Sequence, residues 1–160
     1  RPLIEKYKNE QHTYLVGYSY GAPIVTRMLM EDPELANGLV LVSGALDPQN
    51  EKVYWVSYPG NWFFIRWMLP RAVRVTNREK LSHVAQLTQM LPYWDRISAP
   101  VTVIQGLADE LVVPANAVFA VRKLSQAPTR LIFVPNQRHR IPHDQPHIIK
   151  AALMEYLRHN

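Results

Sequence analysis

Apolar residues along this chain occur in two patterns. Continuous runs rich in Val, Leu and Ile are typical of strands covered on both faces, whereas apolar residues that recur every three or four positions indicate helices. The runs predict strands at residues 14–18, 38–43, 101–105 and 130–134. The helical spacing predicts helices at residues 2–11, 22–32, 114–124 and 145–158. Because strands alternate with helices, we expect an α/β fold with a mostly parallel sheet flanked by helices.

The segment between the second and third predicted strands breaks this alternation, since it is much longer than an ordinary connection. Large aromatic residues gather in its first half: Tyr54, Trp55, Tyr58, Trp62, Phe63, Phe64 and Trp67. A helical pattern follows at residues 79–90. Ligands bind at the carboxyl ends of the strands in open α/β sheets, so we expect the insertion to form a helical lid there. The chain then divides into a core of residues 1–46 and 99–160 and a lid of residues 47–98.

One motif joins the first predicted strand to the helix after it, Gly17-Tyr18-Ser19-Tyr20-Gly21. In such a turn the serine is held in strained backbone geometry, and flanking glycines let the strand and the helix approach each other. The strain would lift the Ser19 hydroxyl above the sheet edge, where the N–H groups of the following helix could stabilise an oxyanion. The alternative is an ordinary strand-to-helix turn with a solvated serine.

A serine hydroxyl is a poor nucleophile unless a base takes its proton and a third group orients that base. Asp109 follows the third predicted strand and His139 follows the fourth. Both would lie at the same sheet edge as Ser19, and the order serine, acid, histidine is known from one of the serine-triad folds. Asp47, just past the second strand, is an alternative acid.

Composition limits the other classes of function. With 160 residues, 48% of them apolar and 19% charged, the chain is expected to form one globular domain. It has no cysteine, which excludes disulfides, thiolate nucleophiles and zinc–thiolate sites. No apolar run approaches the roughly 20 residues that span a bilayer, and the compartment stays open.

The net charge of +5 raises the question of a nucleic-acid partner. The basic residues that cluster are Arg66, Arg71, Arg74, Arg78 and Lys80. No zinc-finger spacing, phosphate loop or RNA-binding aromatic signature accompanies them, so we expect a solvated basic face and no nucleic-acid binding. Residues 62–74 mix aromatics with arginines, which leaves membrane contact by the lid as an alternative to simple packing.

The remaining histidines are open to a different interpretation. His143 and His147 are spaced as on a helix and, with Asp144, could suggest a metal site. We favour a position near the start of the last helix for His143 and on the surface of that helix for His147, and expect no metal. Further surface histidines are predicted at the following positions: His12, His83 and His159.

Three segments in this order resemble the second half of an α/β-hydrolase: residues 17–21, 106–114 and 139–146. The resemblance implies Ser19 as nucleophile, His139 as general base and then acid, and Asp109 as the group that orients it. It also implies the backbone N–H of Tyr20 as an oxyanion donor. The substrate would be a small-molecule ester or thioester with an apolar acyl group, and no organic cofactor is implied. We expect three aromatic residues near the serine to contact this substrate: Tyr18, Trp62 and Trp67.

The α/β-hydrolases usually have about four strands before this turn, and a loop among them carries a second oxyanion donor. Neither feature is found here, so we expect this chain to be part of a longer hydrolase. The strand at residues 14–18 would then meet the missing N-terminal half or a partner strand at an exposed sheet edge. Three alternatives stay open: an inactive fragment of a longer hydrolase, a non-catalytic module that only binds ligands, and a role in assembly through that edge.

Overall fold

The computed structural model describes residues 12–50 and 83–159. The predicted helix at residues 2–11 and the aromatic cluster of the predicted lid lie outside these residues, and so do Trp62 and Trp67.

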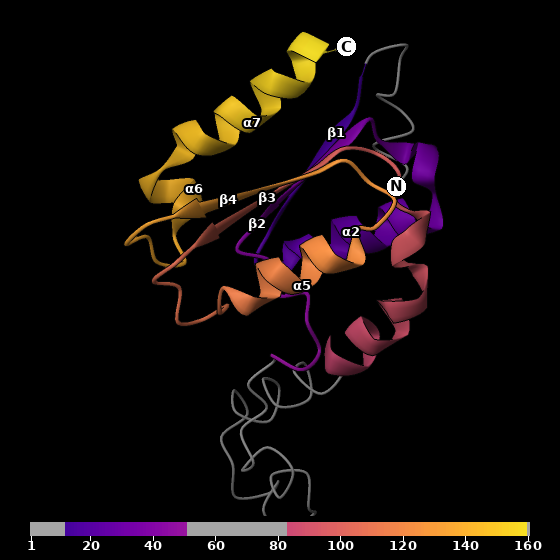
Figure 1. Cartoon of the computed structure of the whole chain (residues 1–160), viewed down its shortest axis with the longest axis horizontal. Helices are drawn as coiled ribbons and strands as arrows, with labels where there is room; N and C mark the ends of the chain where they lie inside the picture. The colour runs from indigo at the N-terminus through magenta and orange to yellow at the C-terminus, as the bar shows by residue number, and fades with distance from the viewer. Residues whose placement is uncertain (1–11, 51–82, 160) are drawn as a thin grey trace, which may run out of the picture.

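The described residues form one parallel sheet of four strands. The strands are β1 (Tyr14–Tyr18), β2 (Gly38–Val42), β3 (Val101–Gly106) and β4 (Thr129–Val134). They lie in the order β1-β2-β3-β4, and each neighbouring pair is parallel. The α/β fold with a mostly parallel sheet is confirmed, and each strand lies within one residue of its predicted limits. All four carboxyl ends therefore meet at one edge of the sheet (Figure 1).

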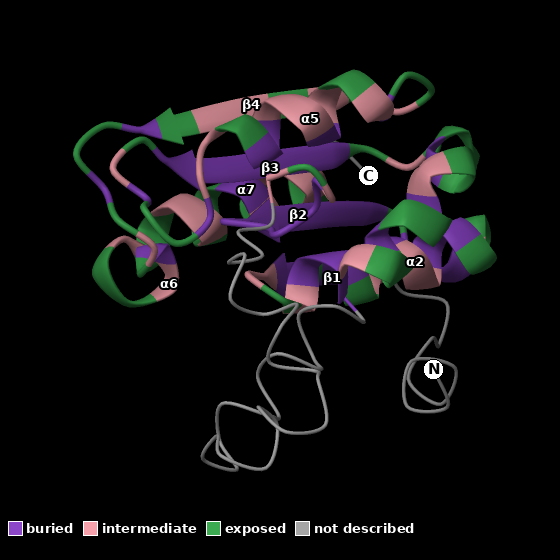
Figure 2. Cartoon of the chain, turned by 90° about the horizontal axis from the view of Figure 1, so that it is seen from below, coloured by how far each residue is buried: buried purple, intermediate pink, exposed green. Residues whose placement is uncertain are grey.

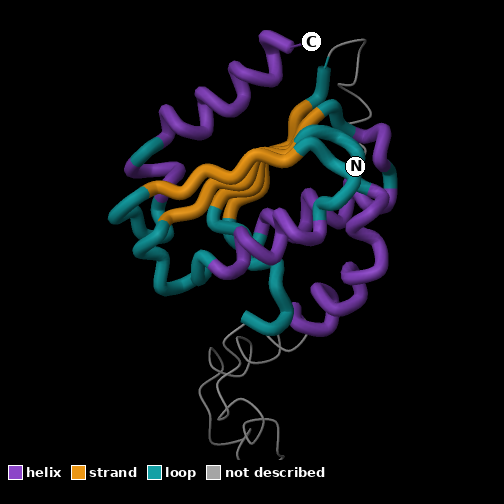
Figure 3. Tube along the Cα trace, viewed as in Figure 1, coloured by secondary structure: helices purple, strands orange, loops and turns teal. Residues whose placement is uncertain are grey.

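Helices cover both faces of the sheet. The longer ones are α2 (Gly21–Glu31), α5 (Ala115–Lys123) and α7 (Pro146–His159). The short ones are η1 (Pro33–Leu35), η4 (Leu91–Arg96) and α6 (Ile141–Asp144). Figures 1 and 3 show α2 and α5 on one side of the twisted sheet and α7 on the other, so the described part is built of three layers.

The central strands are buried on both faces because their side chains alternate between two cores. In β2, Leu39 and Leu41 join the cluster formed with α2 and α5, whereas Val40 and Val42 join the cluster formed with α7. Every residue of β2 and β3 is buried (Figure 2). A strand of this kind reads as a continuous apolar run, which is why the sequence located it well.

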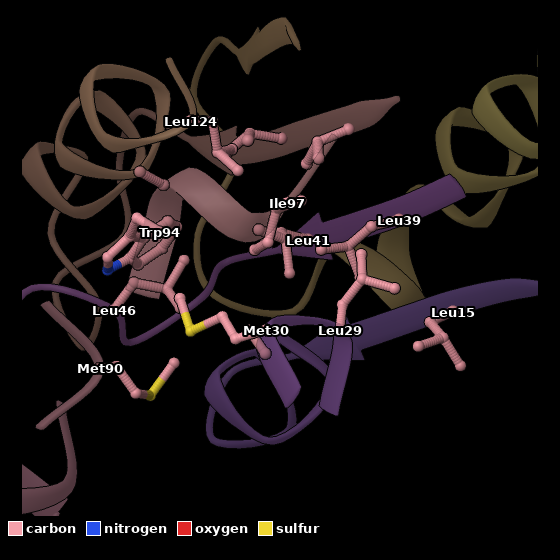
Figure 4. Close-up of a cluster of buried hydrophobic side chains, with 14 of the residues drawn as sticks. Leu15, Leu29, Met30, Leu39, Leu41, Leu46, Met90, Trp94, Ile97 and Leu124 are labelled. Atoms are coloured by element: carbon pink, nitrogen blue, oxygen red, sulfur yellow. The ribbon is translucent and has the colours of Figure 1, made fainter. Parts of the chain in front are cut away.

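Residues 83–90 form a helix that leads directly into η4. Leu87, Met90 and Trp94 are almost completely buried, and they belong to the same cluster as Leu46 and Met30 (Figure 4). The end of the insertion thus packs into the core beneath α2. The division into a core and a lid of residues 47–98 stays a prediction, because residues 51–82 are outside the described part.

Tyr156 fastens α7 to the sheet. Its hydroxyl lies 2.8 Å from the Thr102 hydroxyl and donates to the Leu39 carbonyl at 3.1 Å. Burial raises the pKa of Tyr156 above its usual value, and the charge of Glu155 adds to this effect. The phenol is therefore held in its neutral form on the α7 side of the sheet.

Candidate active site

The turn between β1 and α2 carries Ser19 in a backbone conformation that side chains rarely adopt, with φ of 52°. Its N–H donates to the Val42 carbonyl at 3.0 Å, and its carbonyl accepts from the Ala22 N–H at 3.1 Å. A non-glycine residue at positive φ is strained and persists only where its surroundings fix it. The predicted strained turn is thus observed, and these hydrogen bonds hold it.

The two glycines of the motif differ in what they do. A Cβ at Gly17 would lie 2.5 Å from Val25 Cγ2 and 2.6 Å from Ala22 Cα, so this glycine lets β1 and α2 approach. A Cβ at Gly21 would meet nothing within 4 Å. The expectation that Gly21 is needed for close approach is therefore wrong. Gly44, in the loop after β2, is the second glycine that allows close approach to α2, since a Cβ there would lie 2.7 Å from the Cβ of Ala22.

Asp109 lies in the loop that follows β3, with its side chain fully buried. One carboxylate oxygen, Oδ1, accepts the backbone N–H groups of Leu111 and Val112 at 3.0 and 2.9 Å. The other, Oδ2, accepts from Gln105 Nε2 at 3.3 Å and lies 2.8 Å from His139 Nδ1. Both oxygens have partners, so the carboxylate is fixed in orientation although it is removed from water.

His139 lies in the loop after β4, where its ring bridges two elements of the sheet edge. Nδ1 faces Asp109 at 2.8 Å and Nε2 lies 3.0 Å from Ser19 Oγ. With Nδ1 protonated and bonded to the carboxylate, Nε2 is the basic nitrogen and faces the hydroxyl proton. The structure thus brings Ser19, His139 and Asp109 into one hydrogen-bonded chain across the carboxyl ends of β1, β3 and β4.

The loops that carry the acid and the histidine are joined to each other. The Ala108 N–H donates to the Gln137 carbonyl at 3.0 Å, and the Leu107 N–H donates to the Val134 carbonyl at 3.0 Å. A Cβ at Gly106 would collide with the Gln137 carbonyl, so only glycine allows this close approach. Arg138 and Arg140, on either side of His139, are exposed.

Tyr20 precedes the first residue of α2 and has helical backbone angles. Its backbone N–H is thus at the positive end of an 11-residue helix, beside Ser19. This is the place predicted for an oxyanion donor, and the donor role stays a prediction. The Tyr20 ring lies 4.3 Å from the ring of His83, centroid to centroid.

His83 was expected at the surface, and this expectation is wrong, since only 5% of its surface is exposed. His83 is the first described residue of the helix at residues 83–90, and its ring lies against that of Tyr20. A groove of about 630 Å³ begins there and runs along α2. Its apolar walls are formed by the following residues: Pro23, Ile24, Met28, Leu87 and Met90.

The other predicted site residues lie apart from this chain of hydrogen bonds. The Asp47 carboxylate accepts from the Gln49 N–H at 2.9 Å and from the Asn50 amide. The Asp47 N–H in turn donates to the buried Asn116 side chain. Asp47 thus shapes its own loop, whereas the imidazole of His139 faces Asp109.

His143 lies in α6 and His147 in the first turn of α7, both exposed, and the Asp144 carboxylate accepts from the Gln137 amide at 3.0 Å. Among residues 12–50 and 83–159, no group of three His, Asp or Glu side chains could hold a metal ion.

Tyr18 was predicted to contact substrate. Its hydroxyl donates to the backbone carbonyl of His139 at 3.0 Å, and its ring lies 5.1 Å from the imidazole. The contact with substrate stays a prediction. Burial, followed by the charge of Asp109, raises the pKa of Tyr18 above its usual value.

Gln105 is a further contributor that the sequence did not reveal. It is the fifth residue of β3, and its amide donates to the Val112 carbonyl at 2.9 Å as well as to Asp109. The signal in the sequence was a long polar side chain, Gln105, near the end of a mainly apolar strand.

The comparisons with known proteins concern the family and the fold. The model of the prolyl oligopeptidase family matches residues 3–159. No curated protein matches the sequence. None of the described helices is both long and apolar enough to cross a membrane.

Several solved structures share the fold. A monoacylglycerol lipase of Paleococcus ferrophilus has a TM-score of 0.74 at 19% identity, over 99% of this chain and 72% of the lipase. An α/β hydrolase from a Medee basin deep-sea metagenome has a TM-score of 0.65 at 20% identity, over 98% of this chain and 68% of that enzyme. An esterase of Pyrococcus furiosus has a TM-score of 0.65 at 18% identity, over 99% of this chain and 58% of the esterase. The chain thus has the fold of these hydrolases and spans between about half and three quarters of their length.

Proposed function

The chain belongs to the prolyl oligopeptidase family, within the α/β-hydrolase superfamily, and from this membership we propose that it is a serine hydrolase. The substrate we propose is a small ester or thioester with an apolar acyl group. Ser19 is the nucleophile, His139 the general base and Asp109 the group that orients the base.

One observation carries this proposal. Ser19 Oγ lies 3.0 Å from His139 Nε2, while His139 Nδ1 lies 2.8 Å from the buried Asp109 carboxylate. A nucleophile, a base and an orienting acid within hydrogen-bond reach of one another are the arrangement that activates a hydroxyl.

The reaction proceeds in two halves. Ser19 Oγ attacks the acyl carbonyl carbon while its proton passes to His139 Nε2, and the carbonyl oxygen becomes an oxyanion near the Tyr20 N–H. When the tetrahedral intermediate collapses, the bond to the leaving group breaks. The leaving alcohol or thiol takes the proton from His139 Nε2, and an acyl-enzyme remains.

In the second half, His139 Nε2 takes a proton from water as the water oxygen attacks the acyl carbon. Collapse of this second intermediate releases the carboxylic acid, and the proton on Nε2 returns to Ser19 Oγ. Asp109 stays ionised throughout and stabilises the imidazolium that forms in each half.

An apolar acyl group is supported by the apolar side chains that α2 and the helix at residues 83–90 contribute to the groove beside Tyr20. Polar side chains of the same two helices also line this groove: Arg27, Glu31, Gln86 and Gln89. Esters are also the substrates named for two of the structures that share the fold, the lipase and the esterase. The family description favours a second candidate, hydrolysis of a peptide bond.

Steady-state hydrolysis separates these candidates. We would compare p-nitrophenyl esters and thioesters of increasing acyl length with proline-containing peptide anilides. The expected result is turnover of the esters that rises with acyl length and disappears in Ser19→Ala. Turnover of the anilides but not of the esters would show that the substrate is a peptide. Turnover that persists in Ser19→Ala would contradict Ser19 as the nucleophile, and no turnover of any substrate would favour a module that only binds ligands.

A further inference from the structure

Tyr18 connects the two loops that carry the nucleophile and the base. It is the last residue of β1 and the neighbour of Ser19. Its hydroxyl donates to the backbone carbonyl of His139 at 3.0 Å, and its ring lies 5.1 Å from the imidazole at a tilt of 34°.

The loop that carries His139 needs such an anchor. Pro135, Asn136, Arg138 and Arg140 are all exposed, and Asn136 has a positive φ of 57°. Such exposed residues contribute few contacts to hold a loop. The backbone of this loop is tied two residues before His139, at the buried Gln137, whose carbonyl accepts from the Ala108 N–H. The bond from Tyr18 fixes the backbone of His139 to the end of β1, directly before Ser19.

We propose that Tyr18 is a positioning residue for the reaction, setting the place of the His139 imidazole relative to Ser19 through the bond to the His139 carbonyl. This inference rests on the proposed function. It assigns Tyr18 a role toward the base in place of the predicted contact with substrate.

The chemistry of the phenol suits this role. A tyrosine hydroxyl has a single proton, so donation to the His139 carbonyl leaves none for a substrate oxygen. Burial and the Asp109 charge raise the pKa of Tyr18, which keeps the hydroxyl protonated as a donor through the neutral and mildly alkaline range. The ring also packs against the imidazole and limits its tilt.

A positioning role predicts a specific kinetic change in Tyr18→Phe. The ring remains, but the tie between the His139 backbone and β1 is lost. A displacement of about 1 Å at a reacting group can cost about 100-fold in rate, so a partial displacement should lower kcat about 10-fold. KM should stay unchanged, and the loss should be equal for esters of every acyl length.

Tyr14→Phe is the matched control. Tyr14 lies four residues earlier in the same strand, on the same face. Its hydroxyl donates to the Tyr156 carbonyl at 3.4 Å and its ring is stacked on that of Tyr156 at 5.5 Å. The control thus removes the same kind of bond from the same strand, away from His139.

The experiment measures kcat and KM for three p-nitrophenyl esters, the rate of labelling by a fluorophosphonate and the urea unfolding midpoint of wild type and both variants. We expect slower turnover and slower labelling in Tyr18→Phe only, at similar midpoints. The labelling rate, corrected for the folded fraction, provides the same test if Tyr18→Phe is less stable.

Two results would overturn the inference alone. One is an active wild type with equal kcat in the two variants, and the other is a loss in Tyr18→Phe that falls on KM and depends on acyl length. A wild type without Ser19-dependent turnover or labelling would overturn the proposed function together with this inference.

Discussion

At the scale of single residues, the candidate site depends on how Asp109 is held. Its side chain is fully buried, and its oxygens face two backbone N–H groups, the Gln105 amide and the imidazole of His139. A buried carboxylate without partners would be strongly destabilising, so this set of hydrogen bonds is what allows a negative charge beneath the imidazole. The charge in turn favours the tautomer that presents a basic Nε2 to Ser19.

Asp109→Asn is expected to lower kcat by about 10³- to 10⁴-fold, the scale of the same change in serine proteases, because the amide favours the wrong imidazole tautomer. The control is Asp47→Asn, since Asp47 was the alternative acid. The amide oxygen would still accept the Gln49 N–H, and the bond from the Asn50 amide would be lost. We expect kcat of Asp47→Asn to change by less than about threefold. Ester hydrolysis by the two purified variants is the measurement. A large loss in Asp47→Asn with little loss in Asp109→Asn would reverse the assignment of the acid.

At the scale of elements, the approach of α2 to β1 and to the loop after β2 determines the strained turn at Ser19. Gly17 and Gly44 allow this approach, because a side chain at either position would collide with Ala22. The hydrogen bonds from Ser19 to Val42 and from Ala22 to Ser19 then fix the turn. The conformation of the nucleophile is thus a product of helix packing.

Gly17→Ala is expected to destabilise the protein by about 1–3 kcal/mol, since the added methyl overlaps backbone atoms of α2 that cannot move alone. Gly21→Ala is the control, because its Cβ would meet nothing within 4 Å. At the first position of a helix it should be neutral or stabilising by up to about 1 kcal/mol. Urea unfolding of both variants measures the difference. Equal free energies of unfolding for the two variants would contradict the packing described for Gly17.

The contact of α7 with the sheet predicts a dependence of stability on pH. The pKa of Tyr156 is raised above its ordinary value of 10.0 in the folded state, chiefly by burial. The unfolded chain therefore loses this proton first, and the contribution to stability is complete below pH 10 and is lost as pH rises above it.

Tyr156→Phe tests this dependence. The variant loses hydrogen bonds to Leu39 and Thr102 at every pH, but its free energy of unfolding should fall less steeply than that of wild type between about pH 9 and about pH 11. Urea unfolding at several pH values gives both slopes. Parallel slopes would show that the Tyr156 hydroxyl does not contribute to the alkaline loss of stability.

At the scale of the whole molecule, the features that local pattern determines were predictable and those that depend on distant contacts were not. The strands of the sheet were located within a residue, because each is built on a short run that is mainly apolar. That Ser19, Asp109 and His139 lie at one edge was also predictable, because each follows a strand and the strands are parallel. The burial of His83 was missed, because its partner Tyr20 is 63 residues away in the sequence, as their numbers show. The sequence also did not show that a side chain at Gly21 would fit, because the space around a residue depends on how the structure packs.

The helix at residues 83–90 and η4 are expected to unfold together with the sheet, because their apolar side chains share its core. Trp94 is 2% exposed, and its ring meets Phe119 of α5 edge to face at 5.7 Å. Trp94→Ala should therefore cost about 3–5 kcal/mol, as expected for a large core side chain. Thermal unfolding followed by far-UV circular dichroism should remain one transition at a lower midpoint. A separate early transition in wild type would show instead that this segment unfolds as its own unit.

The central claim, that Ser19 is an activated nucleophile, is tested most directly by covalent labelling with a fluorophosphonate and mapping of the modified residue by mass spectrometry. Ser125 is the matched control, since it is an exposed serine whose hydroxyl donates to Asp95. We predict one label per chain, located on Ser19, absent from Ser19→Ala and retained in Ser125→Ala. No label on wild type, or a label that persists in Ser19→Ala, would contradict the account.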